Sequence, residues 1–259
     1  MIKISVITVV YNGINLIEKT IKSVLDQSYL NIEYIIIDGN SNDGTKDILN
    51  KYVKFQNVKI YSEKDNGIYD AMNKGIQFSN GEWVLFLNAG DTFFTNDIID
   101  NIFGGNKINF INFEFLYGDV NVIYSNFNRI IKAGDINSIW KGMQFSHQSV
   151  FIKNSYHKNK LYNIKYKVVA DFNFIFNSYI ENAKFLYLNK VISNTIIGGI
   201  SDKNRFSTFL STFNIILKKR KNTKIYIFFI FHFIYIFLTH VIKYFTPLFF
   251  RNILIKRFK

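Results

Sequence analysis

Three short clusters of polar residues carry groups that could do chemistry. Each directly follows an apolar run, and the clusters are Tyr11-Asn12, residues 38–43 and residues 88–91. Their carboxylate and amide oxygens are the ligands that hard divalent cations prefer. Because the chain contains no Cys, the sequence excludes a disulfide framework, a thiolate metal site and a thiolate nucleophile.

Common phosphate- and calcium-binding motifs do not account for these clusters. Neither G-x-x-x-x-G-K-[ST] nor G-x-G-x-x-G occurs in the sequence, so the usual nucleotide-binding loops are absent. The segment that begins at Asp38 has oxygen-bearing side chains at the first, third and fifth positions of a calcium loop. However, Asp43 stands where that loop requires Gly, and Leu49 stands where it requires Glu. We therefore reject a calcium loop.

The elements that must position the clusters alternate between strands and helices. Apolar runs predict buried strands, and apolar residues repeating at helical spacing predict helices between them. We expect strands at residues 4–10, 32–37, 58–61 and 83–87, and helices beginning near residues 16, 45 and 68. Such alternation is typical of a mostly parallel sheet with right-handed crossovers, which puts the carboxyl ends of its strands at one edge. Ligands bind at that edge, so the three clusters should meet in one crevice.

The pattern is weaker beyond residue 110. We expect a pair of strands around Gly118-Asp119, strands at residues 149–152 and 185–188, and a helix at residues 171–179. Nothing in this half predicts a binding specificity.

Four blocks within residues 5–91 resemble the family 2 glycosyltransferases with the GT-A fold, especially the branch that builds bacterial surface polysaccharide. The blocks are SVITVVYNG, IIIDGNSNDGT, EKDNGIYDAMNKGI and GEWVLFLNAGD, and a weaker likeness continues through HQSVF (147–151) and VADFNF (169–174). The resemblance fades near residue 201. It implies an α/β catalytic domain over residues 1–201, with a nucleotide-binding half at 1–91 and an acceptor half at 110–200.

The resemblance also implies a site for a nucleotide-sugar, with a UDP-sugar as the expected donor. The expected donor contacts are Thr8, Tyr11, Asn12, Asp38, Asp65, Lys74, Asn88, Ala89 and Gly90. Two of these residues have structural alternatives: Asp38 as a turn residue, and Lys74 in an i,i+4 ion pair with Asp70.

A divalent cation, Mg²⁺ or Mn²⁺, would stabilise the departing diphosphate. Family members commonly carry a D-x-D-type acidic cluster at this point. Here Asn88 and Gly90 occupy the first and third positions, which leaves Asp91 as the candidate metal ligand. The alternatives are a low dependence on metal, or a role for Asp91 as a helix cap.

The resemblance assigns the general base to Asp171, at the start of a helix in VADFNF. Inversion at the anomeric carbon requires a carboxylate that takes the proton of the acceptor hydroxyl. A helix cap is the structural alternative for Asp171, and Asp135 and Asp119 are alternative bases. Contacts with the acceptor or the donor phosphate are expected from His147, Gln148, Gly198 and Gly199.

The basic character of the chain belongs to its tail. Of the formal charge of +13, the segment from Lys203 to Lys259 contributes 12 Lys and Arg with no Asp or Glu, so the first 202 residues carry only +1. This placement argues against a nucleic-acid partner. Aromatic and aliphatic residues separate the basic ones, and residues 225–242 carry no formal charge. We expect residues 202–259 to form a helical tail on an anionic membrane surface. This tail should lie in the membrane interface rather than span the bilayer. A hairpin buried in a dimer is the alternative.

The first residues alternate like a strand and lack the features of a signal peptide. Together with the basic tail, this favours the cytoplasmic face of the membrane, and the resemblance implies an inverting glycosyltransferase there, with a glycan or lipid-linked glycan as acceptor. Two alternatives stay open: a non-catalytic nucleotide- or glycan-binding module of the same fold, and a nucleotidyltransferase.

Overall fold

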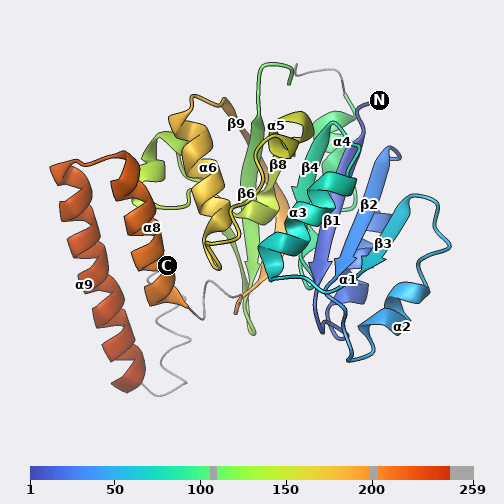
Figure 1. Cartoon of the computed structure of the whole chain (residues 1–259), viewed down its shortest axis with the longest axis horizontal. Coiled ribbons are helices and arrows are strands. Elements are labelled where there is room, and N and C mark those ends of the chain that lie inside the picture. Colours follow the sequence, from blue (N-terminus) through green and yellow to red (C-terminus); the bar gives the residue numbers. More distant parts are fainter. Residues whose placement is uncertain (106–109, 199–203, 246–259) are drawn as a thin grey trace.

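The computed structural model describes residues 1–105, 110–198 and 204–245 (Figure 1). Its first half is the predicted alternation of strands and helices. The elements are β1 (Ile4–Val10), α1 (Ile17–Leu25), β2 (Ile32–Asp38), α2 (Thr45–Asn50), β3 (Val58–Ser62), α3 (Ile68–Phe78) and β4 (Trp83–Phe86). β1 pairs in parallel with both β2 and β4, and Val10 lies opposite Asp38. The predicted convergence of these strand ends at one edge is confirmed.

The second half adds antiparallel strands to the same sheet. Its elements are β5 (Thr92–Phe93), α4 (Ile98–Phe103), β6 (Phe115–Ile123), β7 (Asn128–Ile131), η1 (Ile136–Lys141), η2 (His147–Ser149), β8 (Val150–Lys153), α5 (Asn154–Lys158), α6 (Ala170–Ile180) and β9 (Phe185–Ile196). The strand order is β3-β2-β1-β4-β8-β6-β9-β5, with β7 paired to β6. β8 runs antiparallel to both β4 and β6, so the sheet is mixed.

The expected strand pair around Gly118-Asp119 is wrong. Both residues lie inside the single strand β6, which pairs in parallel with β9. A Cβ at Gly118 would lie 2.4 Å from the backbone oxygen of Lys190, so glycine here permits close approach of β9 rather than a turn. β9 is also longer than the expected 185–188, because it continues past two register irregularities to Ile196.

Apolar residues alternate between two clusters, one on each face of the sheet. In β1, Ile7 and Val9 face the cluster that contains α3 and α6, whereas Val6 and Val10 face the cluster that contains α1. These side chains are all nearly inaccessible to solvent. The sheet is thereby fixed on both faces, which leaves its strand ends for ligands.

Two helices follow the sheet and form a hairpin at one end of the molecule (Figure 1). They are α8 (Arg205–Lys219) and α9 (Thr223–Phe245). From α8, Phe209, Ile215 and Ile216 are buried in the same apolar cluster as α6. Trp140 of η1 packs edge-on against Phe228 of α9, with ring centroids 5.5 Å apart. The hairpin is thus packed onto α6 and η1 rather than held away from them.

Candidate active site

Asp171 lies in the first turn of α6 and contacts two other elements. One carboxylate oxygen accepts a hydrogen bond from the Tyr69 hydroxyl of α3 at 2.8 Å. The other lies 3.6 Å from Nδ1 of His147. The cap position of α6 belongs to Val169, and no side chain caps this helix. The carboxylate of Asp171 therefore faces the space between α3 and η2, and the helix-cap alternative does not describe it.

His147 connects this carboxylate to the end of β4. Its Nε2 lies 3.3 Å from the side-chain nitrogen of Asn88. Burial lowers the pKa of His147, although the charge of Asp171 acts in the opposite direction. The imidazole is therefore neutral at pH 7. With the Asn88 amide as donor, Nε2 accepts and the ring proton lies on Nδ1, toward Asp171.

A tight turn places Asp91 beyond β4. The backbone N–H of Asp91 donates to the carbonyl of Asn88 at 2.9 Å, and Gly90 adopts a φ of +100° that favours glycine. The hydroxyl of Thr20, on α1, accepts from Gly90 N–H and donates to the Asp91 carbonyl. Thr20 was missed from the sequence, where it reads only as one position of a helical stripe.

The Asp91 carboxylate is buried and contacts the second half of the chain. It accepts hydrogen bonds from the side-chain amide of Gln148 at 3.1 Å and from Ile196 N–H at 3.4 Å. Burial raises its pKa to about 7, although both hydrogen bonds and the charge of Lys19 act to lower it. The next helix, α4, begins seven residues later with Asp97 at its cap position. Asp91 is therefore not a helix cap.

The donor atoms at this turn suit a hard cation. The side-chain oxygen of Asn88 is buried without a hydrogen-bond partner, and the Asp91 carboxylate lies three residues further along the chain. Both are oxygen ligands of the kind that Mg²⁺ and Mn²⁺ prefer. Among the described residues, no group of three His, Cys, Asp or Glu gathers around a possible ion.

The loops after β1 and β2 are joined by side chains that the sequence assigned to the donor. The Asp38 carboxylate is fully buried and accepts hydrogen bonds from the hydroxyls of Ser41 and Ser62, at 2.5 and 2.6 Å. Asn12, which has a φ of +49°, accepts from the backbone N–H of Asn42 at 3.0 Å. These contacts stabilise the loops, as expected for turn residues.

Thr8 and Tyr11 differ in exposure. Thr8 is fully buried, and its hydroxyl contacts Tyr34 and the Leu87 carbonyl, so its side chain belongs to the core. Tyr11 is 65% exposed. A Cβ at Gly39 would lie 2.5 Å from the Asp65 carboxylate and 3.3 Å from the Tyr11 ring. Gly39 therefore lets Tyr11 and Asp65 approach one another across the loops.

Lys74 forms intramolecular contacts on α3. Its ammonium lies 2.9 Å from the carboxylate of Glu63 and 3.8 Å from that of Asp70, and it donates to the Lys64 carbonyl at 2.9 Å. The hydrogen bond to Glu63 is the main cause of its raised pKa. The i,i+4 pair with Asp70 is thus present. No contact joins Lys74 to Asp91 or Asp171 within the part of the chain that the structure describes.

The two alternative bases have other partners. Asp119 accepts hydrogen bonds from Ala133 N–H at 2.9 Å and from the Tyr187 hydroxyl at 2.8 Å. Asp135 caps η1 by accepting from Asn137 N–H. Gly198 adopts a φ of +103°, whereas Gly199 lies outside the described residues.

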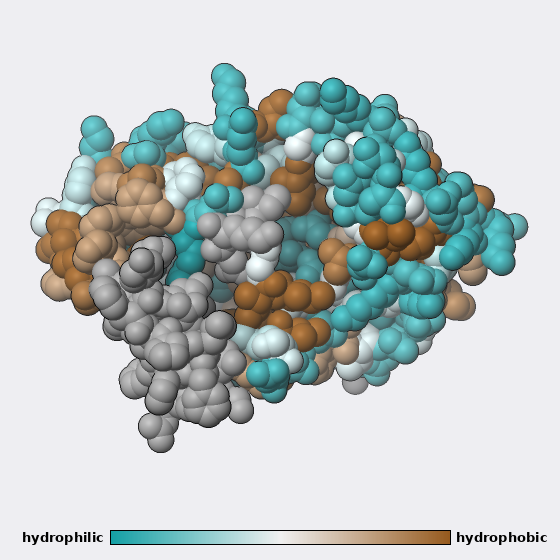
Figure 2. Space-filling model, turned by 90° about the horizontal axis from the view of Figure 1, so that it is seen from below, coloured by the Kyte–Doolittle hydropathy of each residue, from teal (hydrophilic) through white to brown (hydrophobic). Residues whose placement is uncertain are grey.

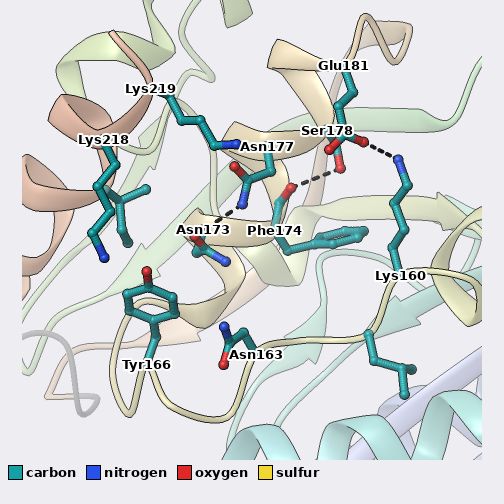
Figure 3. Close-up of a pocket in the computed structure, with 12 residues that line it drawn as sticks. Lys160, Asn163, Tyr166, Asn173, Phe174, Asn177, Ser178, Glu181, Lys218 and Lys219 are labelled. Atoms are coloured by element: carbon teal, nitrogen blue, oxygen red, sulfur yellow. Dashed lines mark hydrogen bonds and ion pairs between the residues drawn. The ribbon is translucent and has the colours of Figure 1, made fainter. Parts of the chain in front are cut away.

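A pocket of about 440 Å³ opens on Asp171. His147 and Asp171 form one side of it, and residues of α8 and α9 form the other. A second pocket of about 370 Å³ lies on the face of α6 that carries Asn173 and Asn177 (Figure 3). None of the predicted site residues lines this second pocket, and an ion pair between Lys160 and Glu181 lies at its edge.

Comparison with known proteins identifies a family for the first part of the chain. Residues 5–103 match the model of glycosyl transferase family 2. An uncharacterised glycosyltransferase of Haemophilus influenzae is 29% identical over 226 residues, which cover 84% of this chain and 89% of that protein. Residues 5–103 of this chain therefore belong to glycosyltransferase family 2. This glycosyltransferase is also 43% identical over 90 residues to the putative teichuronic acid biosynthesis glycosyltransferase TuaG of Bacillus subtilis, covering 34% of this chain and 36% of TuaG.

Solved structures confirm the GT-A fold of this glycosyltransferase. The structure of S. aureus TarS 1–349 in complex with UDP-GlcNAc has a TM-score of 0.65 at 18% identity, covering 85% of this chain and 68% of that one. The mannosyltransferase PcManGT from Pyrobaculum calidifontis, in complex with GDP-Man and Mn²⁺, has a TM-score of 0.62 at 14% identity, covering 87% and 67%. At these identities the likeness concerns the fold alone.

Proposed function

We propose that this glycosyltransferase inverts the anomeric centre of a UDP-sugar as it transfers the sugar to an acceptor hydroxyl, with Asp171 as the general base. One observation carries the proposal. The Asp171 carboxylate contacts Tyr69 and His147, and His147 contacts Asn88 at the end of β4. The proton acceptor and the donor end of the sheet thus belong to one connected site.

In the proposed reaction, the acceptor hydroxyl gives its proton to the Asp171 carboxylate. The acceptor oxygen forms a bond to the anomeric carbon, while the bond from that carbon to the diphosphate oxygen breaks with its electron pair. The nucleoside diphosphate leaves on the opposite face. General-base catalysis of this kind contributes about 10²–10⁴-fold in rate. The Tyr69 hydroxyl would orient the carboxylate throughout, because its raised pKa keeps it protonated.

The donor would lie along the ends of β1, β2 and β4. Tyr11 and Asp65 are available to the nucleotide, and Asp38 would act through the loop that it stabilises. The turn from Asn88 through Ala89 and Gly90 would face the diphosphate. We leave Thr8 out of this proposed site because its hydroxyl is used in the core. Lys74 would reach the donor only by leaving Glu63.

Asp91 and Asn88 would hold a divalent cation, Mg²⁺ or Mn²⁺, that neutralises charge on the leaving diphosphate. The buried, unpartnered oxygen of Asn88 supports this assignment, as does the Mn²⁺ in the PcManGT complex. The UDP-GlcNAc complex of TarS supports a UDP-sugar as donor. Gln148 would position Asp91 through its amide hydrogen bond.

The acceptor would be a glycan or lipid-linked glycan of a bacterial surface polysaccharide, as the name of TuaG suggests. Residues 202–259 would bring the site to an anionic membrane at its cytoplasmic face, with 1–201 as the catalytic domain. Hydrophobic side chains gather over the end of the molecule that α9 forms (Figure 2). They include Ile230, Phe231 and Phe237, which are more than half exposed. Within the described part of the chain, no helix meets the length and hydropathy needed to cross a bilayer.

A screen of nucleotide-sugars by thermal shift would test the donor class, because a ligand that binds the folded state raises its apparent stability. We expect UDP-sugars with Mn²⁺ to raise the melting temperature, and the product of turnover to be UDP. Release of pyrophosphate would instead identify a nucleotidyltransferase. Failure of every nucleotide-sugar to bind would contradict the proposal.

A further inference from the structure

The pocket that opens on Asp171 is built jointly by residues before 199 and by the hairpin of α8 and α9. Asp171 and His147 line it, and the hairpin contributes residues from both of its helices. From α8 these are Arg205, Thr208, Phe209 and Thr212, and from α9 they are Phe229, His232 and Ile236. A helical pair that served only to tether the protein would not need to form a wall of the site.

The hairpin side of this pocket combines an apolar surface with cationic and polar groups. The rings of Phe209 and His232 stack with centroids 5.5 Å apart, and Phe229 lies 5.5 Å from Phe209. Arg205 is close enough to contribute, after burial, to lowering the pKa of His232. On α8, Arg205, Thr208 and Thr212 recur at helical spacing, so one polar edge of the helix faces the cavity.

The charges of the pocket are separated. Asp171 is the one carboxylate among the residues that line it, and it lies on α6, next to His147. Arg205 lies on the hairpin side, and Lys141 lies at the end of η1. Residues 204–245 contain no Asp or Glu. A ligand with a negative charge would therefore be attracted to Arg205 and repelled from Asp171, which orients it in the pocket.

We propose that the hairpin recognises the acceptor, and that this acceptor is an amphiphile with an anionic phosphate group and an alkyl chain. Arg205 binds the phosphate, and the stacked rings of Phe209 and His232 contact the alkyl chain. The hydroxyl that receives the sugar then faces Asp171. This inference rests on the proposed function of Asp171 as base, and it adds the chemical class of the acceptor and the residues that select it.

Binding of dodecyl phosphate, below its micelle-forming concentration, tests the inference on the full chain by titration calorimetry. Arg205→Ala should weaken binding of dodecyl phosphate about tenfold, the loss expected for one charge-assisted contact. It should leave binding of the uncharged 1-dodecanol unchanged. The matched control is Arg220→Ala, which removes a cation of the same hairpin that lies over the Tyr179 ring and not in the pocket. Arg220→Ala should bind both probes as the wild type does.

Phe209→Ala should weaken binding of both probes, because it removes apolar contact rather than charge. Because Phe209 is buried, the melting temperature of the Phe209→Ala variant must be measured alongside its binding. If this variant fails to fold, Arg205→Ala still decides the test, because Arg205 is exposed. Equal loss in Arg205→Ala and Arg220→Ala would overturn the inference, since the effect would then reflect net charge.

Vesicles of anionic phosphatidylglycerol separate a soluble ligand in the pocket from lipid headgroups at the surface. Arg205→Ala should sediment with these vesicles as the wild type does. If it lost vesicle binding but kept dodecyl phosphate binding, Arg205 would belong to a membrane contact and the inference would be wrong. UDP binding is the independent check: its absence in the wild type would contradict the proposed function, whatever the alkyl probes show.

Discussion

The hydroxyl of Tyr69 donates a hydrogen bond to Asp171 at 2.8 Å, although the two residues are 102 positions apart in the sequence. The same hydroxyl lies 2.9 Å from the carbonyl of Val168, just before α6. Tyr69 is nearly buried, and burial, followed by the charge of Asp171, raises its pKa. Helix α3 thus holds the candidate base in place through a protonated phenol.

Tyr69→Phe should lower kcat about tenfold, as expected when a charge-assisted hydrogen bond that orients the base is lost. Its affinity for UDP should not change, because the proposed nucleotide site lies at the strand ends. Tyr29→Phe is a matched control that loses a hydroxyl bond to the Ile2 carbonyl, far from α6. Steady-state kinetics and melting temperatures of both variants check this. An unchanged kcat in Tyr69→Phe would show that Asp171 needs no such support.

Asp91→Ala should abolish the dependence of UDP affinity on Mn²⁺, because it removes the proposed carboxylate ligand. In the wild type, burial raises the pKa of Asp91 to about 7. Below pH 7 a proton therefore competes with the cation, and Mn²⁺ should bind about tenfold more weakly for each further unit of pH. Titration of Mn²⁺ against UDP affinity at pH 6 and pH 8 measures both effects. Equal metal dependence in the variant and the wild type would place the ligand elsewhere.

Glu33 in β2 should contribute to stability in a manner that depends on pH. Burial would raise its pKa, but hydrogen bonds from Ser5 and Asn80 N–H and the nearby Lys3 together lower it to about 2. Since the unfolded value is about 4.3, this stabilisation is present above pH 4.3 and is lost as the pH falls toward 2.

Glu33→Gln should therefore cost roughly 3 kcal/mol at pH 7, by the conversion of a pKa shift into free energy, and distinctly less at pH 3. Urea denaturation at the two pH values measures the difference. A loss of the same size at both would mean that the carboxylate's charge contributes nothing.

Replacing Ile230, Phe231 and Phe237 together by Ser should release the protein from anionic vesicles without unfolding it, because all three are exposed on α9. High salt should not release the wild type, since apolar contact is not screened. Truncation after residue 201 is a less selective test, because it also removes Phe209, Ile215 and Ile216 from the core. Wild type that stays in the supernatant would contradict the membrane proposal.

Much of the first half of the fold could be predicted because burial imposes a regular pattern on the sequence. The predicted strands at 4–10 and 32–37 correspond to β1 and β2, and the helix Ile68–Phe78 begins at the predicted residue. In the second half, polar residues interrupt β9, and Gly118 reads as a turn although it allows close packing of two strands. The local sequence pattern cannot predict the length of β9 or the role of Gly118, because both depend on pairing with a strand that is distant in the sequence.

The candidate site follows the same division. The ends of parallel strands could be located from the sequence, which brought Asp38 and Asn88 to one edge. The contact of Tyr69 with Asp171 could not be predicted, because nothing local indicates that its hydroxyl meets a residue 102 positions away. The contribution of α8 to the pocket was also missed, since nothing local specifies where a helix packs. The roles of the site residues in catalysis stay predictions.

Asp171→Asn tests the central claim most directly, because it keeps the size of the side chain and removes only the proton acceptor. We expect sugar transfer to fall about 100-fold or more, the lower end of what a general base contributes. UDP affinity should stay within about threefold of the wild type, since an interaction confined to the transition state lowers kcat without affecting binding. Transfer that persists above about a tenth of the wild-type rate would contradict the assignment of Asp171 as the base.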